Sequence, residues 1–304
     1  MKAESSHDII VIGGGVAGLT AALYALRSGR SVLVLEKEAV GGQIANSPRV
    51  ENFPSQSSIS GIDLADSLFN QVLEQGGEFE LENVESAEKI GKAFEVKTDY
   101  ALRGAKSVII ATGVHHKKLR LPKEEELKGI SYCAVCDGAF YKGEEVVLIG
   151  DANTALQYIL LMSNYCKKVT VLTLFDRFFG DKVLIDRVLQ RENVLWLKEA
   201  VTVAFEGEKE LSGVTYKDKE GALHTVNTRA AFIAIGQAPD NKVFSSLVAL
   251  DKEGYIAAGE DCVTSCEGIF AAGDCRSKKV RQLTTACADG AVAALAANAY
   301  IDSL

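Results

Sequence analysis

A glycine run between an apolar strand and an apolar helix is the feature that most limits the fold of this chain. The segment DIIVIGGG is followed by VAGLTAALYALRSG and then by SVLVLEKE. Two apolar runs of about six residues therefore bracket a helix with apolar residues at helical spacing. This order predicts a βαβ unit, the building block of a parallel sheet covered by helices.

The same order returns near the middle of the chain. The segment EVVLIGDANTALQYILLMSNYCKKVTVLTLF predicts a strand at 146–149, a helix at 154–165 and a strand at 169–173. The predicted fold class is α/β, with two Rossmann-like, doubly wound, three-layer dinucleotide-binding domains. The closing segments, GIFAAGD and a helix from about 284 to 300, match the surroundings of the first unit. We therefore predict that the second domain, 116–245, is inserted into the first, 1–115 and 246–304.

The first glycine loop, GGGVAG, has the G-x-G-x-x-G spacing at Gly13, Gly15 and Gly18. The first glycine permits a tight turn, the second lets a pyrophosphate approach the backbone, and the third permits close packing of helix and strand. Glu36 stands at the end of the next strand, where a carboxylate can accept hydrogen bonds from a ribose. A glycine turn with no ligand would leave Glu36 unexplained, so we predict a nucleotide site.

Composition and charge exclude several classes of protein. The 304 residues carry a formal net charge of -8, whereas a protein that binds duplex nucleic acid needs a basic surface. No window approaches the roughly 20 apolar residues that cross a membrane, and the glycine loop interrupts any signal-peptide core. We expect a cytoplasmic protein that binds neither nucleic acid nor membrane.

Two of the seven cysteines, Cys133 and Cys136, form the motif CAVCD with Asp137. A Cys-x-x-Cys pair beside nucleotide folds favours redox chemistry, because one thiolate can attack and its neighbour can resolve the mixed disulfide. A zinc site would need two more ligands, such as Cys262 and Cys266, whose spacing is not that of a zinc knuckle. An inert buried pair is a further alternative, and Asp137 could be a turn or helix-capping residue. We predict a redox dithiol and no metal.

Several motifs together resemble those of the low-molecular-weight thioredoxin reductases, which are flavoprotein disulfide reductases. They are GGGVAG, EKE, VGGQ, VENFP, IIATG, CAVCD and GIFAAGD followed by VRQLTTACADG, and they span nearly the whole chain. The resemblance implies a cytoplasmic homodimer that binds FAD. Besides the glycine loop and Glu36, it implies that FAD lies near Gly42, Gln43, Asn52, Gly113, Asp274, Arg281 and Gln282.

The resemblance also implies roles for the dithiol. Cys136 would face the flavin and receive electrons, while Cys133 would exchange with the disulfide of thioredoxin, the partner. Asp137 would serve as acid and base, because it adjoins the pair and none of the four histidines resembles the general acid of larger relatives.

The second glycine loop departs from the family pattern. It reads GDANTA, so Ala152 stands where a glycine would admit a pyrophosphate and Asp151 adds a negative charge beside it. The next strand ends in Thr173, Leu174 and Phe175, at positions where family members carry a histidine and two arginines that pair with the extra phosphate of NADPH. An intact flavin site and dithiol beside this degenerate loop resemble ferredoxin-dependent flavin thioredoxin reductases.

We therefore predict a thioredoxin reductase in which reduced ferredoxin replaces NADPH as the electron donor. Two basic segments, HHKKLR at 115–120 with Lys123 and Lys278 with Lys279 and Arg281, are candidate docking sites for the acidic ferredoxin. Alternatives are an NADPH-dependent thioredoxin reductase, a diflavin disulfide oxidoreductase with a second flavin in the degenerate site, and a non-catalytic flavin redox sensor.

Overall fold

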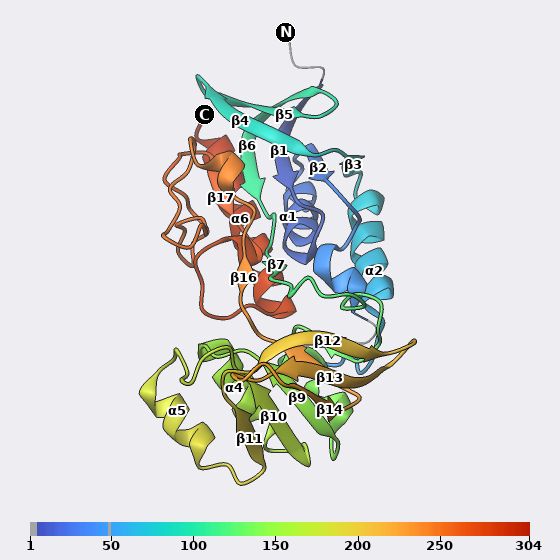
Figure 1. Ribbon diagram of the computed structural model, residues 1–304. Helices are drawn as coiled ribbons and strands as arrows, with labels where there is room; N and C mark the ends of the chain where they lie inside the picture. The colour runs from blue at the N-terminus through green and yellow to red at the C-terminus, as the bar shows by residue number, and fades with distance from the viewer. Residues whose placement is uncertain (1–4, 48–49) are drawn as a thin grey trace. The chain divides into compact units, whose positions relative to one another are not determined.

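The computed structural model describes residues 5–47 and 50–304 and divides the chain into two compact units (Figure 1). The first unit comprises residues up to His115 together with Ala238–Leu304, and the second comprises His116–Gln237. Each unit has its own parallel sheet, in agreement with the predicted α/β class.

The first unit is built on a seven-stranded sheet with the order β3-β2-β1-β6-β5-β4, in which β17 also pairs with β6. The predicted βαβ unit forms the centre of this sheet, where β1, β2, β6 and β17 run parallel. The strands are β1 Ser5–Ile12, β2 Val32–Glu36, β3 Glu78–Leu81, β4 Val84–Ile90, β5 Ala93–Thr98, β6 Leu102–Ile110 and β17 Ile269–Ala271.

Helices cover one face of this sheet. The residues Ile9 and Val11 of β1 face the helices, whereas Ile10 and Ile12 face the β4–β5 meander and the segment after β16. A Cβ atom at Gly290 would lie 2.3 Å from the carbonyl oxygen of Ala17, so this glycine lets α6 pack closely against α1. The helices are α1 Val16–Arg27, α2 Gly61–Glu74 and α6 Leu283–Asp302, with short helices η1 Gly42–Asn46, η3 Lys242–Phe244 and η4 Gly273–Cys275.

The second unit has a five-stranded parallel sheet with the order β11-β10-β9-β15-β8. One face packs against α4, and the other packs against a three-stranded antiparallel sheet, so the unit has three layers. The parallel strands are β8 Ile130–Ser131, β9 Glu145–Ile149, β10 Lys168–Leu172, β11 Val194–Leu197 and β15 Ala231–Ile233. The antiparallel strands are β12 Val201–Gly207, β13 Leu211–Lys217 and β14 Leu223–Asn227, and the helices are α3 Ala134–Asp137, η2 Gly138–Tyr141, α4 Asn153–Met162 and α5 Lys182–Leu189.

The two chain segments that join the units pair with each other. β7, His115–His116, and β16, Gln237–Ala238, form a two-stranded sheet. The return to the first unit therefore comes at residue 238 and not at the expected 246. The difference arises because Phe244 is buried in the core of the first unit and the Asn241 side chain donates hydrogen bonds to the carbonyl oxygens of Gly254 and Cys275.

The longest helix in the described part of the chain is α6, with 20 residues. Neither it nor any other helix within residues 5–47 and 50–304 is long and apolar enough to cross a membrane. The small residues of α6, among them Ala293, Ala294 and Ala297, are instead buried against α1 and the first sheet.

Candidate functional site

The parallel strands of the first unit bring the predicted cofactor-binding residues to one edge of the sheet. Gly13 follows β1, Glu36 ends β2, Gly113 follows β6 and Asp274 follows β17. Because these four strands run parallel, their carboxyl ends meet at the same edge, where ligands of open α/β sheets bind. The topology thus gathers residues that are up to 261 positions apart in the sequence, from Gly13 to Asp274.

The glycine loop has the shape that a pyrophosphate requires. A Cβ atom at Gly13 would lie 2.3 Å from the oxygen of Ala111, and one at Gly18 would lie 1.9 Å from the oxygen of Gly13. Both positions therefore need glycine for packing. At Gly15, the residue that caps α1, the atom nearest to an added Cβ is the Gly41 oxygen at 3.8 Å. The amino end of α1 is thus open to an anion.

Glu36 is held against the glycine loop by two backbone groups. Its Oε2 accepts a hydrogen bond of 2.7 Å from the Gly14 N–H, and its Oε1 accepts one of 2.9 Å from the Glu38 N–H. These contacts fix the carboxylate beside the loop. A carboxylate at this place can accept further hydrogen bonds from ribose hydroxyls, because each oxygen has two lone pairs.

The segment after β2 forms a second wall of the same site. The Gly41 N–H donates to the Gly14 oxygen at 2.8 Å, and a Cβ at Gly42 would contact the Gly15 Cα at 3.4 Å. The side chain of Gln43 donates to the oxygen of Val114, so it ties this wall to the segment after β6. Gly113, with φ of 66°, has no atom within 4 Å of an added Cβ and borders open space.

Two buried polar groups at this edge lack partners within the described part of the chain. They are the Oδ1 of Asp274 and the Nε of Arg281. Burial raises the pKa of Asp274 to about 6, although the nearby positive charges of Lys278 and Arg281 oppose this effect. Buried polar atoms are nearly always hydrogen-bonded, so these two groups indicate a polar ligand.

The amino end of α6 lies beside these groups. Gln282 precedes the helix, and its side-chain oxygen accepts a hydrogen bond of 3.4 Å from the Asn52 amide. The guanidinium of Arg281 lies over the ring of Tyr255, 4.3 Å from its centroid. The residues 52, 281 and 282, which were predicted from separate motifs, therefore come together at one helix end.

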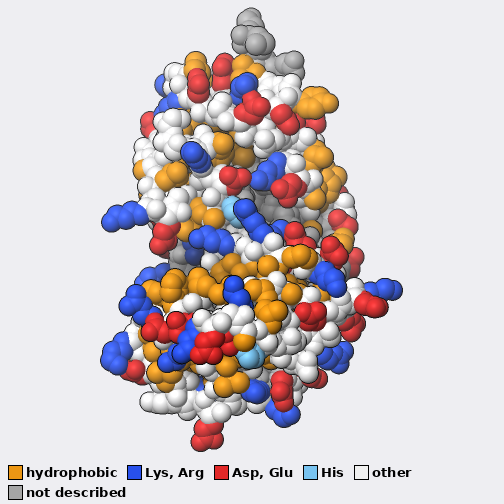
Figure 2. Space-filling model, in the orientation of Figure 1, with side chains coloured by type: hydrophobic (Ala, Val, Ile, Leu, Met, Phe, Trp, Pro, Cys, Tyr) orange, Lys and Arg blue, Asp and Glu red, His pale blue; other side chains and the backbone are white. Residues whose placement is uncertain are grey.

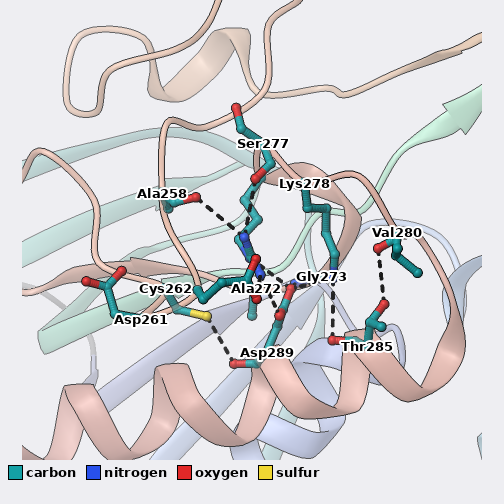
Figure 3. A network of polar contacts seen from close by, with 12 residues as sticks. Ala258, Asp261, Cys262, Ala272, Gly273, Ser277, Lys278, Val280, Thr285 and Asp289 are labelled. Carbon is teal, nitrogen blue, oxygen red and sulfur yellow. Dashed lines mark hydrogen bonds and ion pairs between the residues drawn. The ribbon is translucent and has the colours of Figure 1, made fainter.

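A buried ion-pair network lies behind this site (Figure 3). Asp289 of α6 accepts hydrogen bonds from the Nε and Nη2 of Arg276 at 2.9 and 2.8 Å, from the Nζ of Lys278 at 2.8 Å and from the Gly273 N–H at 3.0 Å. Although burial raises the pKa of Asp289, the hydrogen bonds from Arg276 and Lys278 lower it below its ordinary value. The network fixes the loop that carries Asp274 against α6.

This network changes the interpretation of the second basic segment. The side chain of Lys278 is only 5% exposed and is paired with Asp289, so it is not available to dock a partner. Sequence reasoning missed Asp289 as its partner. The signal was present, because an aspartate in an otherwise small and apolar helix needs a buried counter-charge.

The cysteines of CAVCD form a disulfide in the second unit, with 5.3 Å between their Cα atoms. Cys133 precedes the short helix α3, and its Sγ accepts a hydrogen bond of 3.2 Å from the Cys136 N–H. Cys136 is exposed and Cys133 is half-buried. Within the described residues, no cluster of three or more His, Cys, Asp or Glu side chains could hold a metal ion, and Cys262 and Cys266 belong to the first unit.

Asp137 is held close to this disulfide in a largely apolar setting. Its Oδ2 accepts a hydrogen bond of 2.6 Å from Ser131, while its Oδ1 is buried with no partner among the described residues. Burial raises the pKa of Asp137, and the hydrogen bond from Ser131 offsets part of that rise. A carboxyl group with a raised pKa can exchange protons near neutral pH.

The second nucleotide loop keeps the tight turn of the first, but Ala152 stands where the first loop has Gly15. Gly150, with φ of 148°, still allows the close approach of the Ala234 oxygen, which would lie 2.4 Å from an added Cβ. Ala152 now caps α4 and pairs with Phe179, whose N–H donates to the Asp151 oxygen at 2.7 Å. Partial burial also raises the pKa of Asp151.

The three residues directly after β10, Thr173, Leu174 and Phe175, carry no positive charge for a phosphate. Thr173 is fully buried, where its hydroxyl accepts a hydrogen bond from the Trp196 indole and donates to the Phe175 oxygen. Three exposed side chains in this region are apolar, with Leu174 56%, Phe175 47% and Phe179 45% exposed. The guanidinium of Arg177 lies 4.9 Å from the Phe179 ring centroid.

The first basic segment is partly neutralised by contacts within the second unit. Lys118 forms an ion pair with Glu125, and the Nζ of Lys123 donates to the Gly207 oxygen at 2.8 Å. On the face shown in Figure 2, basic and acidic side chains are intermingled.

The chain was compared with known proteins. A family model described as pyridine nucleotide-disulphide oxidoreductase matches residues 7–290. A Clostridium pasteurianum protein, described as a 34.2 kDa protein in a rubredoxin operon, is 38% identical over 99% of each chain. Bacillus subtilis thioredoxin reductase is 38% identical over 100% of this chain and 98% of that protein. The crystal structure of thioredoxin reductase from Streptococcus pyogenes matches with a TM-score of 0.94 and 36% identity, covering 98% of this chain and 99% of that chain.

Proposed function

This chain belongs to the pyridine nucleotide-disulphide oxidoreductase family, and we propose that reduced ferredoxin, and not NADPH, supplies its electrons. Within the family it is a thioredoxin reductase of the low-molecular-weight type, which is a flavoprotein disulfide oxidoreductase. The observation that carries the proposal is the change of residues in the second nucleotide loop, where Ala152 caps α4 at the place that Gly15 holds in the first loop and Thr173, Leu174 and Phe175 follow β10. The proposed electron path runs from ferredoxin through FAD to the Cys133–Cys136 disulfide and on to thioredoxin.

The residues at the edge of the first sheet fit FAD. The open amino end of α1 at Gly15 suits a pyrophosphate, and Glu36 suits a ribose. The unpartnered Oδ1 of Asp274 and the Nε of Arg281 suit hydroxyl and carbonyl groups of the cofactor. Gly42, Gln43, Asn52, Gly113 and Gln282 would line the same site. When bound, FAD supplies a redox centre that accepts electrons singly and releases them in pairs.

The dithiol performs the exchange with thioredoxin. Reduction of the Cys133–Cys136 disulfide takes up two electrons and two protons and yields two thiols. The Cys133 thiolate then attacks the disulfide of thioredoxin, forms a mixed disulfide and releases one thiolate of thioredoxin. Cys136 attacks Cys133 in turn, which restores the disulfide of this chain and releases reduced thioredoxin. Asp137 accepts and returns the protons that these thiolate steps require.

Three features of the second unit disfavour NADPH as donor. Ala152 adds a methyl group at the residue that caps α4, where the first loop has Gly15, and Phe179 stands in the returning segment where the first unit has Gly41. The carboxyl group of Asp151 adds a negative charge when ionised, and apolar side chains replace the cations expected at the end of β10. Each lost contact weakens binding by on the order of 1 kcal/mol or more, so their sum removes roughly 100-fold or more in affinity.

The relative from Clostridium pasteurianum supports a one-electron donor. Its description places it in a rubredoxin operon. We extend that association to this chain as part of the proposal. A donor of this kind delivers electrons one at a time, which suits a flavin and does not suit direct reduction of a disulfide.

The donor can be identified by mixing the anaerobic holoenzyme separately with NADPH and with reduced ferredoxin. We expect ferredoxin to bleach the visible absorbance of the flavin and to sustain thioredoxin reduction. We expect NADPH, even in excess, to bleach it at least 100-fold more slowly. Rapid bleaching by NADPH with steady thioredoxin turnover would contradict the proposal and favour an ordinary NADPH-dependent enzyme.

A further inference from the structure

The side chain of Ser131 links Asp137 to the backbone of the disulfide loop. Ser131 is the last residue of β8, an edge strand that pairs with β15, and it is 8% exposed. Its hydroxyl donates to the Oδ2 of Asp137 at 2.6 Å and accepts a hydrogen bond from the Cys133 N–H at 3.1 Å. The strand thereby holds both the acid and the first residue of the disulfide loop.

A serine hydroxyl has one proton to donate and two lone pairs to accept with. The Asp137 oxygen, at 2.6 Å, takes that proton, since the Cys133 carbonyl lies farther away at 3.5 Å. The Cys133 N–H then occupies a lone pair of the hydroxyl. The hydroxyl therefore has a fixed direction, from Cys133 through Ser131 to Asp137.

This direction distinguishes the two oxygens of Asp137. The Oδ2 is occupied by the hydrogen bond from Ser131, whereas the Oδ1 is buried without a partner among the described residues. A proton that binds to Asp137 can settle on the Oδ1 without breaking the hydrogen bond from Ser131. The Oδ1 is then the atom that carries the proton in both directions of thiol exchange.

We propose that Ser131 is a positioning residue that assigns the exchangeable proton of Asp137 to its Oδ1 and fixes that carboxyl group relative to Cys133. The assignment rests on the proposed role of Asp137 in exchange with thioredoxin. Burial raises the pKa of Asp137, and the hydrogen bond from Ser131 lowers it, so Ser131 stabilises the charged form of the carboxyl group.

Among the described residues, the groups whose pKa values respond to the charge of Asp137 are phenols. Tyr141 of η2 and Tyr158 of α4 both have raised pKa values, chiefly because they are buried and secondarily because the charge of Asp137 lies near them. The hydroxyl of Tyr165 lies close to Gly138, the residue after Asp137, since a Cβ atom added at Gly138 would be 2.3 Å from that hydroxyl. Since these phenols stay protonated at neutral pH, they do not titrate together with Asp137.

Three variants of the holoenzyme test the assignment. Ser131→Ala removes the donor, Ser131→Thr keeps a hydroxyl at a strand end that tolerates a β-branched residue, and Ser163→Ala is the matched control. Ser163 is equally buried in the same unit, at 8%, but its hydroxyl donates to the Leu160 oxygen. A thermal melt of each variant measures any general loss of stability.

The first measurement is the infrared band of the Asp137 carboxyl group as a function of pH, identified by subtraction of the Asp137→Asn spectrum. Loss of a hydrogen bond to the charged form raises a carboxyl pKa, so Ser131→Ala should move the midpoint upward by roughly one pH unit. Ser131→Thr should restore the wild-type midpoint, and Ser163→Ala should leave it unchanged. An unchanged midpoint in Ser131→Ala, or an equal shift in Ser163→Ala, overturns the assignment.

The second measurement separates this inference from the proposed function. The chemically reduced enzyme is mixed with oxidised thioredoxin in a single turnover at several pH values. The pH midpoint of the exchange rate should follow the infrared midpoint in all three variants. If the wild-type enzyme does not exchange with thioredoxin while the infrared midpoint still moves in Ser131→Ala, the proposed substrate is wrong and the positioning by Ser131 stands.

Discussion

The two nucleotide folds of this chain share one contact between the glycine loop and a returning segment, and they differ in the residues that make it. In the first unit the Gly41 N–H donates to the Gly14 oxygen, and Gly15 pairs with Gly41. In the second unit the same two contacts recur, from the Phe179 N–H to the Asp151 oxygen and between Ala152 and Phe179. The returning segment therefore meets the loop in both units, but with glycines in one and with a phenylalanine and an alanine in the other.

The ends of β2 and β10, the second strands of the two βαβ units, also differ in the polar contacts that their residues make. Glu36 turns toward its glycine loop and accepts hydrogen bonds from the backbone there. Thr173, just past the end of β10, turns inward and bonds to Trp196 and Phe175. The two units keep the same βαβ architecture although their loop residues differ, because the core of the second unit is formed by its strands and helices.

The largest expected effect is a loss of thioredoxin reduction at the dithiol of the second unit while the flavin of the first unit can still be reduced. Cys133→Ser should lower thioredoxin turnover by at least about 1000-fold, because no thiolate remains to attack the substrate, yet ferredoxin should still bleach the flavin. Steady-state kinetics measures thioredoxin turnover, and anaerobic absorbance spectra measure reduction of the flavin. Cys266→Ser is a matched control, since Cys266 is a half-buried free cysteine of the first unit and should retain turnover. Persistent turnover in Cys133→Ser would remove its exchange role.

A second prediction concerns the unpartnered acid of the first site. Because burial raises the pKa of Asp274 from 3.8 to about 6, the folded apoprotein binds its proton more tightly than the unfolded chain does. The free energy of unfolding of the apoprotein should therefore be highest below about pH 4 and fall as the pH rises to about 6, by on the order of 2 kcal/mol.

The variant Asp274→Asn should remove this pH dependence and stabilise the apoprotein at pH values above 6, as measured by urea unfolding. Asp176→Asn, at an exposed position of the second unit, is the control and should keep the wild-type pH profile. A flat wild-type profile between pH 4 and 6 would show that Asp274 is already satisfied without FAD.

The smallest expected effect is a partial gain of NADPH binding at the nucleotide loop of the second unit. A triple variant with Ala152→Gly, Phe179→Gly and Phe175→Arg copies the glycines of the first loop and adds a cation. It should bind NADPH roughly tenfold more tightly than the wild type, and the same variant with Phe175→Gln should gain less. Trp196, the only tryptophan, hydrogen-bonds to Thr173 beside this site, so energy transfer from its fluorescence to NADPH reports binding. Tight binding by the wild type would contradict the comparison.

The sequence was sufficient to predict both βαβ units, because their apolar runs and glycine loops are local signals. The strands predicted at 146–149 and 169–173 correspond to β9 and β10, and the final helix is α6. The fold class and the family are confirmed by the parallel sheets and by the comparisons. The assignments of individual residues to FAD and to thiol exchange remain predictions.

The parts that the sequence did not reveal depend on contacts between distant residues. The return to the first unit was placed eight residues too late, because burial of Phe244 in the first core is a tertiary contact. The basic segment predicts Lys278 as a docking residue, but its partner Asp289 lies 11 residues further along and meets it only when α6 packs. Ser131 gave no signal, because its contact with Asp137 depends on how the chain turns after β8.

The pairing of β7 with β16 brings together the two ends of the second unit, which is an inserted domain. The chain leaves the first unit at His115 and re-enters it at Ala238 through neighbouring strands. Beyond this junction β6 and β17 pair directly, from Val108 with Ile269 to Ile110 with Ala271. The first sheet thus keeps its strand order whatever occupies the 122 residues of His116–Gln237. The second unit can therefore change in evolution while the first is retained, since substitutions within His116–Gln237 do not replace the residues that pair β6 with β17.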